Sequence, residues 1–103
     1  MKKSKVIWSN EALTDLEGIY DFLAEKSQPA AQRIVESLLA RTKQLETFPE
    51  SGTKQETLSS KLKQYRYLVE GNYKIIYSYP QAGSVNIEIV YDTRYDPDKL
   101  EVK

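Results

Sequence analysis

The spacing of the hydrophobic residues changes once along this chain, and this change constrains the fold more than any other feature of the sequence. From Ala12 to Leu45 they recur every three or four residues, a spacing typical of amphipathic helices. Between residues 65 and 92 hydrophobic and polar residues largely alternate, which is typical of strands with one buried face. The sequence therefore predicts helices in its first half and a sheet in its second.

Two helices are predicted in the first half. Their hydrophobic stripes are, in order, Leu13, Leu16, Ile19, Tyr20 and Leu23, and then Ala31, Ile34, Val35, Leu38, Thr42 and Leu45. Ser9 and Ser27 precede the stripes, where a serine hydroxyl can cap a helix. Pro29 is tolerated in a first turn, and Phe48-Pro49 ends the second helix. Because the link between them is short, the helices should form an antiparallel hairpin.

Four strands are predicted around these helices. Residues 3–8 form the first, residues 65–69 and 73–79 flank a turn at Glu70-Gly71-Asn72, and residues 85–92 form the last. Polar residues 49–63 are expected to form a loop. The order βααβββ indicates an α+β fold in one domain, residues 1–103, with an antiparallel sheet and the helical hairpin packed on one face of it.

The alternation also predicts which strand residues face the helices. On strand 73–79 these are Tyr73, Ile75, Tyr77 and Tyr79, and on the last strand they are Val85, Ile87 and Ile89. Asn86 and Glu88 should point the other way. Tyrosine is favoured in strands and pairs well across them, so most of these tyrosines are expected to fill the sheet. The second face of the sheet is expected to stay free for a macromolecular partner.

Composition excludes several kinds of site. The chain has no cysteine and no histidine, which excludes disulfides, thiolate nucleophiles and imidazole acid–base chemistry. There is no dense aspartate cluster of the calcium-loop kind, so neither a metal nor another cofactor is expected. We find no apolar stretch typical of a signal peptide or a membrane span, and we therefore expect a cytoplasmic protein that does not enter a membrane.

The charges balance overall but not locally. Fifteen basic and fifteen acidic residues give no net charge, which argues against strong general affinity for nucleic acid. Residues 11–25 carry only acidic charges, and residues 54–74 carry a basic excess. The basic residues of the second run are Lys54, Lys61, Lys63, Arg66 and Lys74. Both runs are also compatible with ordinary solvated surfaces.

Four fragments taken in order resemble the RelE/ParE superfamily, the toxins of type II toxin–antitoxin modules, which are often called plasmid stabilisation proteins. They are "VIWSNEALTDLEGIYDFLAEKS", "PAAQRIVESLLARTKQLETFPESG", "YRYLVEGNYKIIY" and "IEIVYDTRYDP". The shared pattern is Trp-Ser before the first helix, Phe-Pro-x-x-Gly after the second, Arg-x-Leu and Tyr-x-Ile-x-Tyr in the hairpin, and a closing arginine near Asp-Pro. The resemblance covers about residues 6–98 and implies the same βααβββ fold.

The resemblance implies a growth inhibitor that is made with a cognate antitoxin protein and silenced in a toxin–antitoxin hetero-oligomer. A disordered antitoxin segment would fold onto the toxin. RelE-like members cut mRNA in the ribosome, whereas ParE-like members resemble binding proteins that poison DNA gyrase. A third possibility is a degenerate, non-toxic member that only binds its antitoxin.

The resemblance favours the ParE-like branch. Val69 stands where the nuclease branch places an arginine, and Leu100 and Val102 stand where it places a catalytic tyrosine. For the gyrase hypothesis the target-binding candidates are Arg66, Arg94, Lys61, Lys63 and Tyr95. For the nuclease alternative the catalytic candidates are Arg66, Arg94, Tyr95 and Lys54, which would have to supply a base, a phosphate clamp and an acid.

The two arginines also have structural explanations. Arg66 could form an ion pair at the surface or at a sheet edge, and Arg94 could pair with Asp92 or Asp96. If the last strand continued as far as Arg94, its parity with Asn86 and Glu88 would place it on the face away from the helices.

Overall fold

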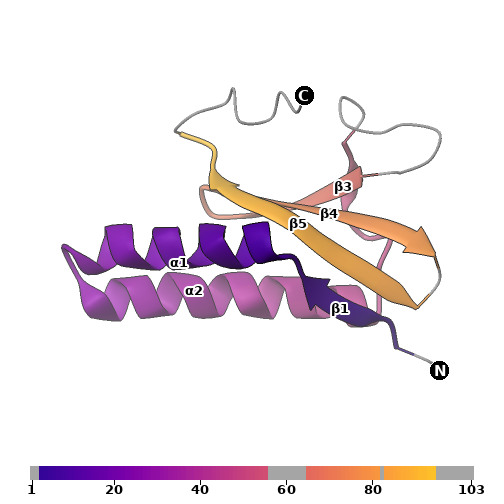
Figure 1. Ribbon diagram of the computed structural model, residues 1–103, viewed down its shortest axis with the longest axis horizontal. Helices are drawn as coiled ribbons and strands as arrows, with labels where there is room; N and C mark the ends of the chain where they lie inside the picture. Colours follow the sequence, from indigo (N-terminus) through magenta and orange to yellow (C-terminus); the bar gives the residue numbers. More distant parts are fainter. Residues whose placement is uncertain (1–2, 56–64, 82, 95–103) are drawn as a thin grey trace.

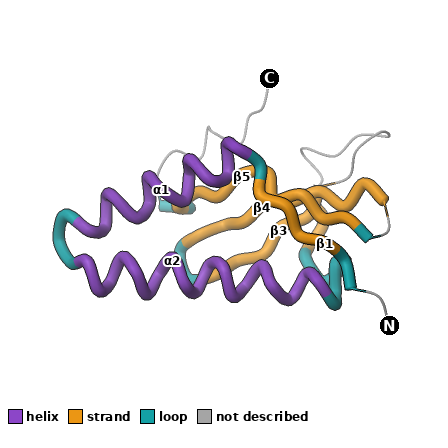
Figure 2. Tube along the Cα trace, turned by 60° about the horizontal axis from the view of Figure 1, so that its bottom comes forward, coloured by secondary structure: helices purple, strands orange, loops and turns teal. Residues whose placement is uncertain are grey.

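A computed structural model describes residues 3–55, 65–81 and 83–94 of the chain (Figure 1). Its elements are β1 (Lys5–Trp8), α1 (Asn10–Ala24), α2 (Gln28–Lys43), the 3-10 helix η1 (Gln44–Glu46), β2 (Thr53–Lys54), β3 (Tyr65–Glu70), β4 (Tyr73–Gln81) and β5 (Ser84–Asp92). The two helices run side by side and cover one face of the sheet (Figures 1 and 2). The predicted α+β class and helical hairpin are confirmed.

Serine side chains begin both helices, as predicted. The Ser9 hydroxyl accepts a hydrogen bond from Ala12 N at 3.0 Å, and the Ser27 hydroxyl accepts one from Ala30 N at 3.2 Å. Each bond satisfies a backbone donor that has no partner within its own helix. Pro29 lies in the first turn of α2, where its missing N–H costs nothing.

The sheet has the strand order β1-β5-β4-β3-β2. From β2 to β5 each neighbouring pair is antiparallel, as predicted, but β1 pairs in parallel with β5. The sheet is therefore mixed. A short hairpin turn forces its two strands to run antiparallel, whereas no such turn joins β1 to β5. A second difference is β2, which lies in the predicted loop 49–63 and pairs Thr53 with Tyr67 and Lys54 with Arg66.

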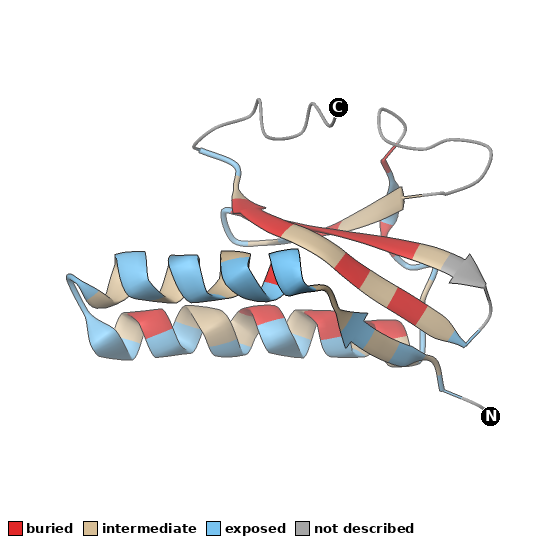
Figure 3. Ribbon diagram, in the orientation of Figure 1, coloured by how far each residue is buried: buried red, intermediate tan, exposed pale blue. Residues whose placement is uncertain are grey.

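The core lies between the helices and the sheet (Figure 3). Tyr73, Ile75 and Tyr77 of β4 are buried there, and Tyr79 packs against them in part, as the alternation predicts. Val85 and Ile87 of β5 are also buried as expected. The helices contribute Ala12, Leu38 and Leu45 to the same cluster.

The prediction for Ile89 is wrong, because β5 contains a β-bulge. Ile76 pairs with Ile89, but the next residue of β4, Tyr77, pairs with Ile87. Glu88 is therefore an extra residue that shifts the alternation, and Val90 rather than Ile89 joins the core cluster. The parity argument for Arg94 fails for the same reason, and also because β5 ends at Asp92.

The start of α1 satisfies the backbone of this bulge. Ser9 donates from its backbone N to Ile87 O at 3.0 Å and from its hydroxyl to Glu88 O at 2.9 Å. Val90 N donates to the Asp15 carboxylate at 3.0 Å. A bulge removes backbone groups from the strand ladder, and here Ser9, the N-cap of α1, and the Asp15 side chain provide partners for them.

Replacing Asp15 with alanine should therefore lower the free energy of unfolding by about 1–2.5 kcal/mol. A hydrogen bond to a charged group contributes about 1.5–3 kcal/mol, and the higher helix propensity of alanine offsets about 0.5 kcal/mol of that loss. Urea denaturation would measure the change. Asp21→Ala, at an exposed position on the same helix, should cost less than about 0.5 kcal/mol, and an equal loss in both variants would contradict the proposed role of Asp15.

Candidate functional site

The predicted site residues lie in different parts of the fold. Arg66 is on β3, opposite Tyr77 of β4, and therefore points to the helix-facing side of the sheet. Lys54 pairs with Arg66 from the short edge strand β2 and is exposed. Arg94 follows the end of β5. Lys61, Lys63 and Tyr95 lie outside the described residues.

Arg66 holds the loop that follows η1. Its Nη1 donates hydrogen bonds to Gly52 O at 2.9 Å and Glu50 O at 3.2 Å. These bonds fix the guanidinium to two backbone carbonyls rather than to the carboxylate that the sequence suggested. Arg66 therefore has a clear structural role next to the edge strand β2, and its charge also lies close enough to lower the pKa of Tyr77.

Tyr77 anchors the same loop from inside the core. Its side chain is fully buried. The hydroxyl accepts a hydrogen bond from Gly52 N at 2.9 Å and donates one to Pro49 O at 2.8 Å. Burial raises the pKa of Tyr77 above its usual value of 10.0, and the Gly52 N–H and the Arg66 charge act in the opposite direction. The neutral phenol is thus the form that the fold favours, and it can donate and accept at once.

Gly52 allows this close approach. A Cβ at this position would lie 2.6 Å from the Tyr77 hydroxyl and 2.7 Å from Tyr67 O, well inside van der Waals contact. The motif Phe-Pro-x-x-Gly gave a signal for this glycine, but alternation placed Tyr77 simply in the core and gave no sign that its hydroxyl would hold a loop.

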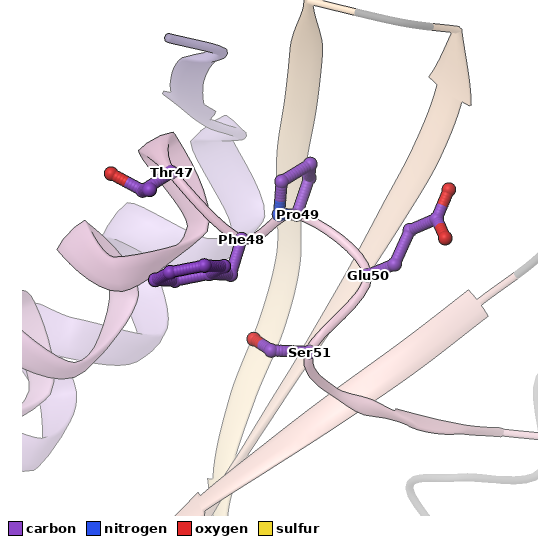
Figure 4. A pocket seen from close by; sticks show the side chains of 5 residues that line it. All are labelled: Thr47, Phe48, Pro49, Glu50 and Ser51. Atoms are coloured by element: carbon purple, nitrogen blue, oxygen red, sulfur yellow. The ribbon is translucent and has the colours of Figure 1, made fainter. Parts of the chain in front are cut away.

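The loop itself presents an exposed ring. Phe48 is 64% exposed. Residues Thr47, Phe48, Pro49, Glu50 and Ser51 line an open hollow of about 400 Å³ (Figure 4). The hydrophobic periodicity of the second predicted helix ended at this point, and nothing in the sequence indicated that the ring would stay outside the core.

Arg94 forms an ion pair with Asp92, one of the two aspartates that the sequence suggested as its partner. Its Nη2 lies 2.8 Å from Asp92 Oδ2, and its Nε donates to Asp92 Oδ1 at 3.1 Å. This bidentate geometry makes the ion pair stronger than a single contact would, and the hydrogen bond from the Arg94 side chain lowers the pKa of Asp92. The arginine side chain remains 54% exposed, against 12% for the aspartate.

Arg66 and Arg94 do not converge on one point. The register places Arg66 beside Tyr77 and Asp92 beside Tyr73. These positions are four residues apart on β4, which corresponds to about 13 Å at the usual rise of a strand. The backbone positions that carry the two arginines are therefore well separated along the sheet.

The second face of the sheet is closed at its centre. Ile76 is 1% exposed, Ser78 is 0% exposed and Tyr91 is 7% exposed. The Ser78 hydroxyl donates to the Glu88 carboxylate at 2.6 Å, and Lys74 Nζ lies 4.0 Å from the centre of the Tyr67 ring, a cation–π contact. The expectation of an open second face is therefore wrong for these central residues.

Neither a metal site nor a membrane span is found in residues 3–55, 65–81 and 83–94. In these ranges no group of three or more acidic side chains is arranged to hold a metal ion. None of the helices there is both long and apolar enough to cross a bilayer.

Comparisons with known proteins agree with this geometry. A family model for the ParE toxin of type II toxin–antitoxin system, parDE, matches residues 6–94. A solved structure of the chromosomal ParDE TA system from P. aeruginosa contains a similar chain, with a TM-score of 0.68 and 16% sequence identity. The similarity covers 87% of this chain and 96% of that one, and at this identity it establishes a shared fold. No curated protein sequence gave a significant match.

Proposed function

Because the chain belongs to the ParE toxin family of type II toxin–antitoxin systems, we propose that it inhibits bacterial growth by binding DNA gyrase in the cytoplasm and that a cognate antitoxin protein neutralises it. The observation that carries this proposal is the family match, which runs from β1 through every described element to Arg94. The shared fold with a chain of a ParDE system supports it.

The arrangement of the cations favours binding over mRNA cleavage. Metal-free cleavage of RNA needs a base, an acid and a phosphate clamp close together. Arg66 Nη1 is bonded to two loop carbonyls and Arg66 pairs with Lys54 across β2 and β3, whereas the Arg94 guanidinium pairs with Asp92 at the end of a different strand. The zero net charge of the chain also gives little general attraction for RNA.

Arg94 is the described residue best suited to contact the target. Its side chain is about half exposed, and the ion pair with Asp92 fixes its orientation. A side chain that is held in place before binding loses less conformational entropy when a partner arrives. Lys61, Lys63 and Tyr95 remain further candidates for the same contact, and no cofactor is required.

The direct test combines toxicity with two target assays. The chain would be expressed from an inducible promoter, alone or with its cognate antitoxin, which we expect a short reading frame beside its gene to encode, and growth would be recorded. Purified protein would then be assayed for inhibition of gyrase supercoiling, and RNA from induced cells would be mapped by primer extension. Inhibited supercoiling with intact mRNA is expected. Codon-linked mRNA cuts would overturn the gyrase assignment, and the absence of any toxicity would indicate a non-toxic member.

Arg94→Ala should weaken gyrase inhibition by at least about tenfold, the effect expected when a fixed arginine at the centre of a protein interface is removed. Titration of supercoiling activity against toxin concentration would measure the change. Arg33→Ala removes an exposed arginine from α2 and should change inhibition by less than about twofold. Equal inhibition by wild type and Arg94→Ala would remove Arg94 from the contact surface.

A further inference from the structure

The Phe48 loop, residues Thr47–Ser51, combines an exposed aromatic ring with a fixed backbone. Phe48 is 64% exposed, more than any other large hydrophobic side chain in the part of the chain that the structure describes. A single exposed hydrophobic residue is common on protein surfaces. What distinguishes Phe48 is the number of bonds that hold the residues around it.

Three side chains hold this loop from different elements. Tyr77 of β4 bridges Pro49 O and Gly52 N, and Arg66 of β3 bonds to Glu50 O and Gly52 O. Gln44 of η1 donates from Nε2 to the Ser51 hydroxyl at 2.9 Å. A loop fixed in this way loses little entropy when a partner binds, and a rigid aromatic residue is a typical anchor of a protein interface.

Two glutamates lie in or next to the loop. Glu46 and Glu50 lie on either side of Phe48 in the sequence, and Glu50 is exposed. Figure 4 shows the Phe48 ring and the Glu50 carboxylate pointing to opposite sides of the loop, with the Pro49 ring between them. The loop thus presents an apolar ring on one side and the Glu50 carboxylate on the other, with the Arg66 guanidinium bonded to the Glu50 and Gly52 carbonyls.

This chemistry selects among possible occupants. Carboxylates repel the phosphates of a nucleic acid. A second copy of the chain, meeting the loop across a twofold axis, would bring the exposed Glu50 carboxylates of both copies to the same interface. The remaining fit is a polypeptide segment that places an apolar side chain against Phe48 and Pro49 and a lysine or arginine near Glu50.

We propose that the Phe48 loop is a docking site for such a basic, apolar segment of the antitoxin. The inference rests on the proposed function, because it takes the antitoxin as the partner. A segment that orders itself on binding carries a large entropic cost of its own, so a receptor loop that is already ordered limits the total cost. The loop is also separate from Arg94. It is bonded to Tyr77 in the middle of β4, whereas Arg94 follows the end of β5, beside the first residue of β4.

The test measures the affinity of purified toxin for the antitoxin that we expect a short neighbouring reading frame to encode. Phe48→Ala should raise the dissociation constant by at least about tenfold, and Glu50→Lys should raise it by about threefold or more at low salt and less at high salt. Phe22→Ala and Glu25→Lys make the same substitutions at exposed positions on and just after α1, and each should change affinity by less than about twofold. Both Phe48→Ala and Glu50→Lys should keep the unfolding midpoint of wild type, because both side chains are exposed.

The outcomes separate this inference from the function on which it rests. If wild type binds the neighbouring protein and Phe48→Ala binds equally well, the docking site is wrong and the proposed function stands. A similar loss in Phe22→Ala would also overturn it, because the effect would not be specific to the loop. If wild type does not bind at all, the proposed partner is wrong and the inference fails with it. Normal antitoxin binding by Phe48→Ala with lost gyrase inhibition would assign the loop to the target instead.

Discussion

Gly52→Ala should destabilise the protein by about 3 kcal/mol, near the upper end of the cost of overpacking. The new Cβ would lie 2.6 Å from the Tyr77 hydroxyl, 2.8 Å from Tyr77 Cε1 and 2.7 Å from Tyr67 O. None of these atoms can easily retreat, because Tyr77 is packed in the core and Tyr67 pairs with Thr53 in the strand ladder. The chain around residue 52 must therefore move, and the hydrogen bond from Gly52 N to the Tyr77 hydroxyl would be strained or lost.

Gly18→Ala is the matched control, because it makes the same chemical change with the opposite expected sign. Gly18 lies inside α1, and a Cβ there would meet nothing within 4 Å. Alanine is favoured over glycine in a helix interior by about 0.8–1 kcal/mol, so this variant should be more stable than wild type. Urea denaturation of the three proteins would measure both effects. A Gly52→Ala protein as stable as wild type would show that the loop is not packed as described.

Local sequence signals predicted most of the elements correctly. Ser9 and Ser27 cap their helices, and Gly71 has the positive φ of 60° that the turn between β3 and β4 needs. These features depend on residues that are close in sequence. Their physical cause is local, and so a single sequence contains enough information to predict them.

The features that were missed depend on contacts between distant parts of the chain. The bulge at Glu88 is stabilised by Ser9 and Asp15, and strict alternation cannot anticipate an extra residue whose partners belong to another element. The direction of β1 is set by its pairing with β5 rather than by a turn. The strand β2 exists because its backbone extends a ladder at β3, although its own residues carry no strand pattern.

The candidate site shows the same limit. Asp92 is two residues from Arg94, and their ion pair was foreseen as one alternative. Arg66 was expected to meet a carboxylate or a target, but its partners are backbone carbonyls of residues 50 and 52. Backbone acceptors are present at every position, so a sequence cannot indicate which of them an arginine will reach. The Phe48 loop was missed because its order comes from these long-range bonds.

The hydroxyl of Tyr77 carries the second large expected effect. Tyr77→Phe should lower the free energy of unfolding by about 2–4 kcal/mol, because it leaves both Gly52 N and Pro49 O without their partner. An unsatisfied buried group costs about 1–3 kcal/mol, and the cost at Pro49 O lies at the low end because Pro49 is only half-buried. The ring itself and its packing are retained, so the loss reports on the two hydrogen bonds of 2.9 and 2.8 Å. Urea denaturation near neutral pH would measure it.

The pH dependence of stability gives this variant a second readout. Burial raises the pKa of Tyr77 above 10.0 in the folded protein, so the folded state holds this proton more tightly than the unfolded state does. The associated stability is fully present below pH 10 and is lost as the pH rises through the folded pKa. Tyr77→Phe should therefore show a shallower loss of stability above pH 10 than wild type. The pKa of Tyr91 is also raised by burial and contributes in the same direction.

Tyr91→Phe separates the effect of the hydrogen bonds from the effect of burial. Tyr91 is buried like Tyr77, but within the described ranges no hydrogen bond to its hydroxyl is found. Its replacement should therefore lower the free energy of unfolding by less than about 1 kcal/mol near neutral pH. It should still reduce the loss of stability that wild type shows above pH 10. If both variants were equally destabilised at neutral pH, the loop would not depend on the Tyr77 hydroxyl, and the fixed backbone that presents Phe48 would lose its main support from the core.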